Sequence, residues 1–148
     1  MKKFKPAFAL PAGQFSDWHF MLLKHEEFQF HYDKPVIVLC DEACISASDG
    51  FLAAFAELPK VTLMGVSSRG GSGSSRSVVL PRSGIAFKLS TMASFRPNGD
   101  TFDGQGIAVD VNAQPPPEDY ITRKDSVLDA ALQMLKPGKK RGQNGCPL

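Results

Sequence analysis

The chain has 148 residues, of which 43% are apolar and 22% charged, and its 17 basic and 15 acidic side chains leave a net charge of +2. This composition fits one globular domain with a core of its own and excludes disordered, collagen-like and coiled-coil proteins. So small a net charge does not favour a nucleic acid as partner, and the longest apolar run, Val36–Cys40, is too short to span a membrane.

Residues 1–34 mix aromatic, charged and proline positions without a clear period and are expected to form an irregular N-terminal segment. The segment begins with basic residues, but prolines interrupt the apolar stretch that a signal peptide needs, so the compartment stays open. His19, His25 and His31 are six residues apart, a spacing that suits neither one helical face nor a metal site. The sequence therefore predicts no metal.

A strand, a turn and a helix are expected next. Val36–Cys40 is apolar throughout and rich in β-branched residues, which is typical of a strand buried in a parallel sheet. After a turn at 41–45, apolar residues recur at helical spacing from Ser46 until Pro59 ends the helix. Val61–Val66 is expected to be the following strand, so that this part of the chain forms a β-α-β unit.

Loops and short strands are predicted for the middle of the chain. Residues 67–75 are rich in glycine and serine and cannot hold regular structure. Short strands are expected at Ser77–Leu80, Ile85–Ser90 and Ile107–Val111, with Met92–Phe95 continuing the second of them.

The C-terminal part is expected to contain a connector, a helix and a tail. Pro115–Pro117 indicates a stiff, extended connector. Asp125 can cap a helix whose apolar side chains form one stripe that ends at Leu135. Residues 136–148 are polar and basic, and so short a basic end is typical of a solvated terminus rather than of a nucleic-acid site.

Ser46 is the candidate nucleophile. It occupies the predicted turn between strand and helix, where the N–H of Ala47 could donate a hydrogen bond to an oxyanion. The same residues form the pattern Ser46-x-x-Asp49, which is that of a capping box. The local pattern leaves a catalytic serine and a simple helix cap both open, and on its own it favours the cap.

Three groups of motifs occur in a fixed order along the chain. They are Pro35–Leu39 with Ile45-Ser46-Ala47-Ser48-Asp49 and Val61–Gly65, then Arg96–Gly99 with Asp103–Asp110, and finally Asp125–Leu135. In order and spacing they resemble the C-terminal-processing (tail-specific) serine peptidases. The resemblance implies an α/β fold of the ClpP/crotonase type, built from β-β-α units, and hydrolysis of a peptide or protein substrate through a serine acyl-enzyme without a cofactor. Such peptidases are often periplasmic or secreted.

The resemblance also implies roles for particular residues. Ser46 would be the nucleophile, the Ala47 amide one oxyanion donor, and Asp103 a supporting acid. Arg69, Gly70 and Gly71 would lie in the loop that contacts the substrate. In the tail-specific branch a lysine of this loop is the general base, but its position here is Gly71. Arg69 cannot replace it, because a guanidinium stays protonated and cannot accept the serine proton.

The missing lysine leaves two alternatives open. The chain could resemble the tricorn branch, in which a histidine from the earlier half of the catalytic domain activates the serine. It could instead resemble non-catalytic relatives, such as the interphotoreceptor retinoid-binding proteins, which bind apolar ligands. A crotonase-like acyl-CoA enzyme is a weaker third reading, since no acidic pair flanks an evident thioester site.

The resemblance covers residues 35–135 and corresponds to the later half of such a catalytic domain. We therefore expect a fragment or truncated product, in which 1–34 precedes the domain part and 136–148 follows it. The strand Val36–Cys40 would then have an exposed sheet edge, through which the chain could form homo-oligomers.

Overall fold

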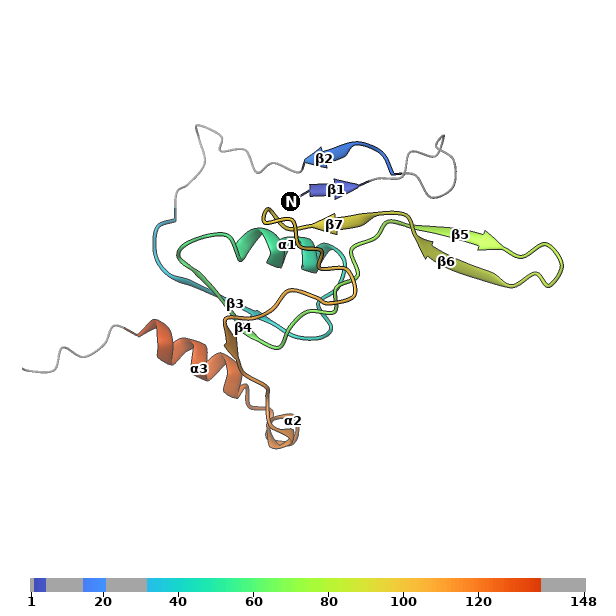
Figure 1. Cartoon of the computed structure of the whole chain (residues 1–148). Coiled ribbons are helices and arrows are strands. Elements are labelled where there is room, and N and C mark those ends of the chain that lie inside the picture. Colours follow the sequence, from blue (N-terminus) through green and yellow to red (C-terminus); the bar gives the residue numbers. More distant parts are fainter. Residues whose placement is uncertain (1, 5–14, 21–31, 137–148) are drawn as a thin grey trace, which may run out of the picture.

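The computed structural model describes residues 2–4, 15–20 and 32–136 and has a mixed α/β fold (Figure 1). His25, His31 and the basic tail after Lys136 lie outside the described residues. The described strands form three small sheets, and the described helices lie on both sides of one of them.

A parallel sheet carries the functional part of the chain. Its strands are β3 (Val36–Cys40), β4 (Val61–Gly65) and β8 (Val111–Asn112), in the order β3-β4-β8. Helix α1 (Ala47–Phe55) connects β3 to β4, so the predicted β-α-β unit is confirmed, with β3 at the expected bounds. The apolar, β-branched composition of β3 and β4 suits strands with neighbours on both faces.

The core lies between α1 and the parallel sheet. The buried side chains of this cluster are Cys40, Leu52, Ala53, Leu63, Phe102 and Ile107. Phe102 and Ile107 come from the long loop before β8 and are each 1% exposed, so this loop closes the core. Full burial of a large apolar side chain contributes about 1.5–3 kcal/mol. Helix α3 (Ser126–Leu135) contacts β3 and β4.

The other two sheets are antiparallel. One has the order β2-β1-β7 and consists of Trp18–Phe20, Lys2–Phe4 and Ala93–Phe95. The other is a hairpin of β5 (Ser75–Val79) and β6 (Ala86–Ser90), which projects away from the rest of the molecule in Figure 1.

Two predictions for these segments were wrong. The N-terminal segment, expected to be irregular, contains β1 and β2. Met92–Phe95 does not continue β6, because β7 is a separate strand that pairs with β1. Strands of three residues offer too few positions for a period of two to become visible in the sequence.

The expected strand Ile107–Val111 is also wrong, since the strand there is only Val111–Asn112. Ile107 is instead buried in the core, and Asp110 bonds to Leu63 of β4 through both its side chain and its backbone N–H. Asp110 Oδ2 accepts the Leu63 N–H at 2.8 Å, and the backbone N–H of Asp110 donates to the Leu63 carbonyl at 2.9 Å.

Among the described C-terminal residues, helix α3 agrees with the prediction, but the proline segment does not. Pro117 is the first residue of helix α2 (Pro117–Thr122) and not part of an extended connector. A proline suits this first helical position because its missing N–H would have no partner there. Asp125 caps α3 as predicted, since its Oδ1 accepts the Leu128 N–H at 2.8 Å.

Apolar surface remains exposed on the described part of the chain. Among the described strands, β3 has a sheet neighbour on one side only. In the stripe of α3, Ala131 is buried while Leu128, Leu132 and Leu135 are 43–50% exposed. Homo-oligomerisation through the exposed edge of β3 stays a prediction.

Candidate active site

Ser46 lies directly before α1, at the end of the turn that follows β3. Its backbone angles are φ 63° and ψ −108°. Such a conformation is rare for a residue with a side chain and is found at active sites held under strain. A residue that only caps a helix normally has an extended backbone. Ser46 is also exposed, so it combines an accessible position with a conformation that capping does not require.

Ser46 and Asp49 do form a capping box. In it the Ser46 N–H donates to Asp49 Oδ2 at 2.8 Å, so this amide is not available to an oxyanion. The next amide is available, because within the described part of the chain the Ala47 N–H has no hydrogen-bond partner. It lies at the N-terminal end of α1, where the helix dipole favours negative charge.

Asp49 is fully buried, with 0% of the residue exposed. Its Oδ1 accepts the Ser68 hydroxyl at 2.6 Å and the Gly70 N–H at 3.0 Å. Its Oδ2 accepts the Ser46 N–H and the Gly71 N–H at 2.8 and 2.9 Å. Burial acts to raise the pKa of this carboxyl, but the four donors outweigh it and hold the pKa below its ordinary value. Because these four donors occupy both oxygens and the pKa is lowered, Asp49 is poorly suited to accept the serine proton.

The predicted substrate loop lies beside this turn. Arg69 is exposed, and its N–H donates to the Cys44 carbonyl at 2.9 Å. A side chain at Gly71 would begin 2.9 Å from the side chain of Ile45, the residue before Ser46. The structure thus brings the loop position that carries a lysine in the tail-specific branch next to the candidate nucleophile.

Asp103 lies in the loop between β7 and β8 and binds Ser72, the residue that follows the predicted substrate loop. Its Oδ1 accepts the hydroxyl and the N–H of Ser72 at 2.6 and 3.1 Å, and its Oδ2 accepts the Ser94 N–H at 2.7 Å. No hydrogen bond joins Asp103 to Ser46 within the described residues. The geometry gives Asp103 a contact with the loop rather than with the serine.

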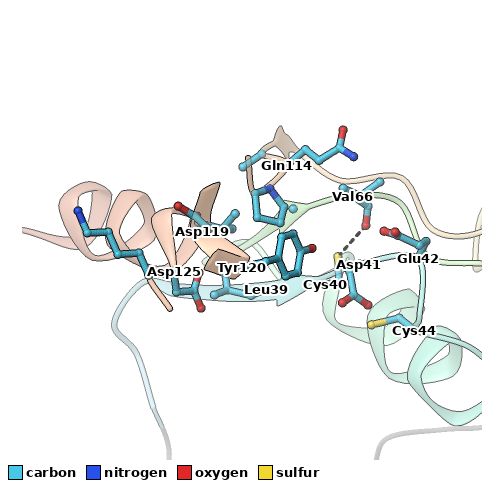
Figure 2. A pocket seen from close by; sticks show the side chains of 15 residues that line it. Leu39, Cys40, Asp41, Glu42, Cys44, Val66, Gln114, Asp119, Tyr120 and Asp125 are labelled. Carbon is cyan, nitrogen blue, oxygen red and sulfur yellow. Dashed lines mark hydrogen bonds between the residues drawn. The ribbon is translucent and has the colours of Figure 1, made fainter. Parts of the chain in front are cut away.

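A pocket of about 410 Å³ opens at the carboxyl ends of β3 and β4 and is bounded by α2 and the start of α3. Figure 2 shows the ring of Tyr120 in this pocket, with Asp41 and Cys44 on one side of it and Asp119 and Asp125 on the other. The pocket includes the turn that precedes Ser46 but not Ser46 itself. A second pocket, of about 380 Å³, is lined by Ala47 and Ser48 together with apolar side chains of β3 and α1.

The thiol of Cys40, one of the two cysteines that line the first pocket, is not an alternative nucleophile. Burial, with the nearby Cys44 and Asp41, raises the pKa of Cys40 from 9.0 to about 11. Its thiol donates to the Val66 carbonyl at 3.5 Å, an interaction drawn in Figure 2. Only a thiolate is strongly nucleophilic, so Cys40 is an inert part of the core.

Within residues 2–4, 15–20 and 32–136, no group of three or more His, Cys, Asp or Glu side chains could hold a metal ion. The helices of these same residues include none with the length and hydropathy of a membrane span.

Comparison with known proteins points to peptidases. The chain is 29% identical over 114 residues to the carboxy-terminal-processing protease of Bartonella bacilliformis, a match that covers 76% of the chain and 26% of that relative. A crystal structure from Parabacteroides merdae, provisionally assigned as a peptidase, is 25% identical with a TM-score of 0.78 and covers 93% of the chain. The tricorn protease is 27% identical with a TM-score of 0.56 over 68% of the chain and 10% of its own length.

The chain spans about a quarter of the Bartonella relative and 43% of the Parabacteroides protein. The model of peptidase family S41 matches residues 11–113, which is more than half of the chain. This match confirms the resemblance found in the sequence motifs, and the chain belongs to peptidase family S41.

Proposed function

We propose that the chain carries the nucleophile of a serine-type peptidase. The observation that carries this proposal is the exposed Ser46 in a strained backbone conformation, directly before an Ala47 amide that has no hydrogen-bond partner in the described part of the chain. The Ser46 Oγ would attack the substrate carbonyl carbon as its proton passes to a base, and the Ala47 N–H would stabilise the oxyanion. Departure of the amine leaves an acyl-enzyme, which water then hydrolyses.

Residues 35–135 would form the C-terminal part of the catalytic domain, of the ClpP/crotonase type, after an N-terminal segment at 1–34. The parallel β3-α1-β4 unit supports this assignment, as does the match of nearly the whole chain to less than half of the Parabacteroides protein. The substrate would be a peptide or protein.

The general base would come from outside the described residues. Position 71 is a glycine, and Asp49 is saturated with hydrogen bonds. A histidine from another part of the domain, as in the branch that resembles tricorn, would act on Ser46. Asp103 would support it indirectly by fixing the loop through Ser72.

A fluorophosphonate probe tests the nucleophile, because it reacts covalently with activated serines. Imidazole added to the reaction can substitute for a missing general base. We expect slow labelling that imidazole accelerates about tenfold or more. Labelling should be lost in Ser46→Ala. Labelling that survives in Ser46→Ala, or its absence at every imidazole concentration, would contradict the proposal.

A second candidate is a non-catalytic module that binds apolar ligands. The apolar lining of the pocket beside Ala47, together with glycine at the lysine position, favours it. In this case a fluorescent fatty acid should bind saturably, and binding should be unaffected in Ser46→Ala. Displacement by a peptide, or loss of binding in that variant, would instead support the peptidase.

A further inference from the structure

We infer that Asp49 is a positioning residue that fixes the backbone of Ser46 and joins it to the loop of residues 68–71, so that both move as one unit. The inference rests on the proposed function only in taking Ser46 as the nucleophile. The hydrogen bonds themselves can be tested without any activity.

Asp49 makes more contacts than a helix cap needs. A capping-box carboxylate has one donor to satisfy, the N–H of the N-cap residue. Asp49 accepts three further donors from residues 19 to 22 positions later in the chain. All four donors are neutral, and a buried carboxylate is tolerated only when such hydrogen bonds compensate it. Asp49 therefore links two distant segments rather than one helix end.

The peptide groups on both sides of Ser46 are held in this arrangement. The N–H of Ser46 belongs to the preceding peptide group and is bound to Asp49 Oδ2. Its carbonyl belongs to the following group and accepts the Gly50 N–H at 3.1 Å. The orientations of these two planes define φ and ψ. Because the Ala47 N–H lies in the second plane, fixing Ser46 also directs the candidate oxyanion donor.

The other end of the link is anchored in the core. The Ser68 hydroxyl that donates to Asp49 also accepts the Ile107 N–H at 2.8 Å. Gly70 lies so close to the loop before β8 that a Cβ there would be 2.3 Å from the Phe102 carbonyl oxygen. The loop is therefore fixed to the core. Through its hydrogen bonds to this loop, Asp49 also restricts the movement of Ser46.

Amide hydrogen exchange of Asp49→Asn, measured by NMR on the full chain, tests the link. Asparagine has the same shape but replaces one acceptor oxygen by an NH2 group, so one pair of donors loses its partner. We expect exchange at Ser46, Gly70 or Gly71 to accelerate about tenfold or more. The controls are the amides of Val66 and Ala113, which donate to strand carbonyls and should keep their rates. Unchanged rates at all three amides, or equal acceleration everywhere, would overturn the inference.

Labelling kinetics separate positioning from binding. In Asp49→Asn the maximal rate of fluorophosphonate labelling should fall about tenfold or more, at an unchanged half-saturating probe concentration. If the parent chain is not labelled at all, the proposed function fails while the exchange rates still decide the role of Asp49.

If Asp49→Asn does not fold, acid titration of the unmodified chain replaces it. The amide shifts of Ser46, Gly70 and Gly71 should then change with one common midpoint while Val66 and Ala113 stay constant. Three different midpoints would overturn the inference.

Discussion

Replacing Gly106 by alanine should destabilise the protein more than replacing Gly104, although both glycines lie in one loop and have the same positive φ. Both have φ +78°, a backbone angle that alanine rarely adopts, so each substitution carries a backbone cost. The two sites differ in what the new Cβ meets. At position 106 it would lie 1.8 Å from the Ser68 carbonyl oxygen, whereas at position 104 nothing lies within 4 Å.

The overlap at Gly106 cannot relax by rotation of a side chain, because the atom in the way belongs to the backbone. Left-handed backbone costs alanine about 1–2 kcal/mol. Overpacking adds about 1–3 kcal/mol. We therefore expect Gly106→Ala to lower the free energy of unfolding by about 2–5 kcal/mol and Gly104→Ala by about 1–2 kcal/mol. Against a typical stability of about 5–15 kcal/mol the first loss is large.

Urea denaturation followed by far-UV circular dichroism measures both values, provided that the slope with denaturant is unchanged. Gly106→Ala should also slow labelling of Ser46, since Ser68 would have to shift away and its hydroxyl holds Asp49. Equal destabilisation of the two variants, to within about 0.5 kcal/mol, would refute the reasoning from close packing.

Three further results are expected. Ser46→Gly should be as stable as the parent or up to about 1 kcal/mol more stable, because glycine relieves the strain at φ 63°. Ser46→Ala should be less stable than Ser46→Gly, because alanine keeps the strain at φ 63° that glycine relieves, and calorimetry showing the opposite order would mean that the backbone is unstrained. The pKa of Asp49 is lower in the folded state than its unfolded-state value of 3.8. The carboxylate therefore contributes its full stabilisation above pH 3.8, and this contribution is lost as the pH falls from 3.8 through the folded-state pKa. Acid denaturation should therefore be less steep in Asp49→Asn, and an identical pH profile would contradict this. Iodoacetamide at pH 8 should modify Cys40 about a hundredfold more slowly than an ordinary thiol, as its raised pKa implies. Mass spectrometry with Cys44 as the internal comparison measures this, and similar rates would refute it.

Elements with a long, regular pattern were predictable. Val36–Cys40 and the helix that follows could be assigned because a run of five apolar residues and a helical period each fit few kinds of local structure. The cap at Asp125 was predictable because capping depends on one side chain and its immediate neighbours. The short strands β1, β2 and β7 were not, since their pairing is decided by distant partners.

The sequence named the residues of the candidate site, whose roles stay predictions, but it did not indicate how they are connected. The motif containing Ser46 identified the nucleophile candidate, and Asp49 was recognised only as part of a cap. Its hydrogen bonds to Ser68, Gly70 and Gly71 depend on how a later loop returns to the helix. The serines and glycines of that loop predicted only irregular structure, whereas in the structure the glycines permit close backbone approach.

The strand that leads into the turn of Ser46, the proposed nucleophile, is the outermost strand of its sheet in the described part of the chain. Its unused backbone donors and acceptors end just before the turn that carries Ser46. Any extended segment that paired there, whichever molecule supplied it, would terminate beside the serine. If a second molecule supplied that segment, association and the reactivity of the hydroxyl would be linked through shared backbone hydrogen bonds, and dilution would alter both.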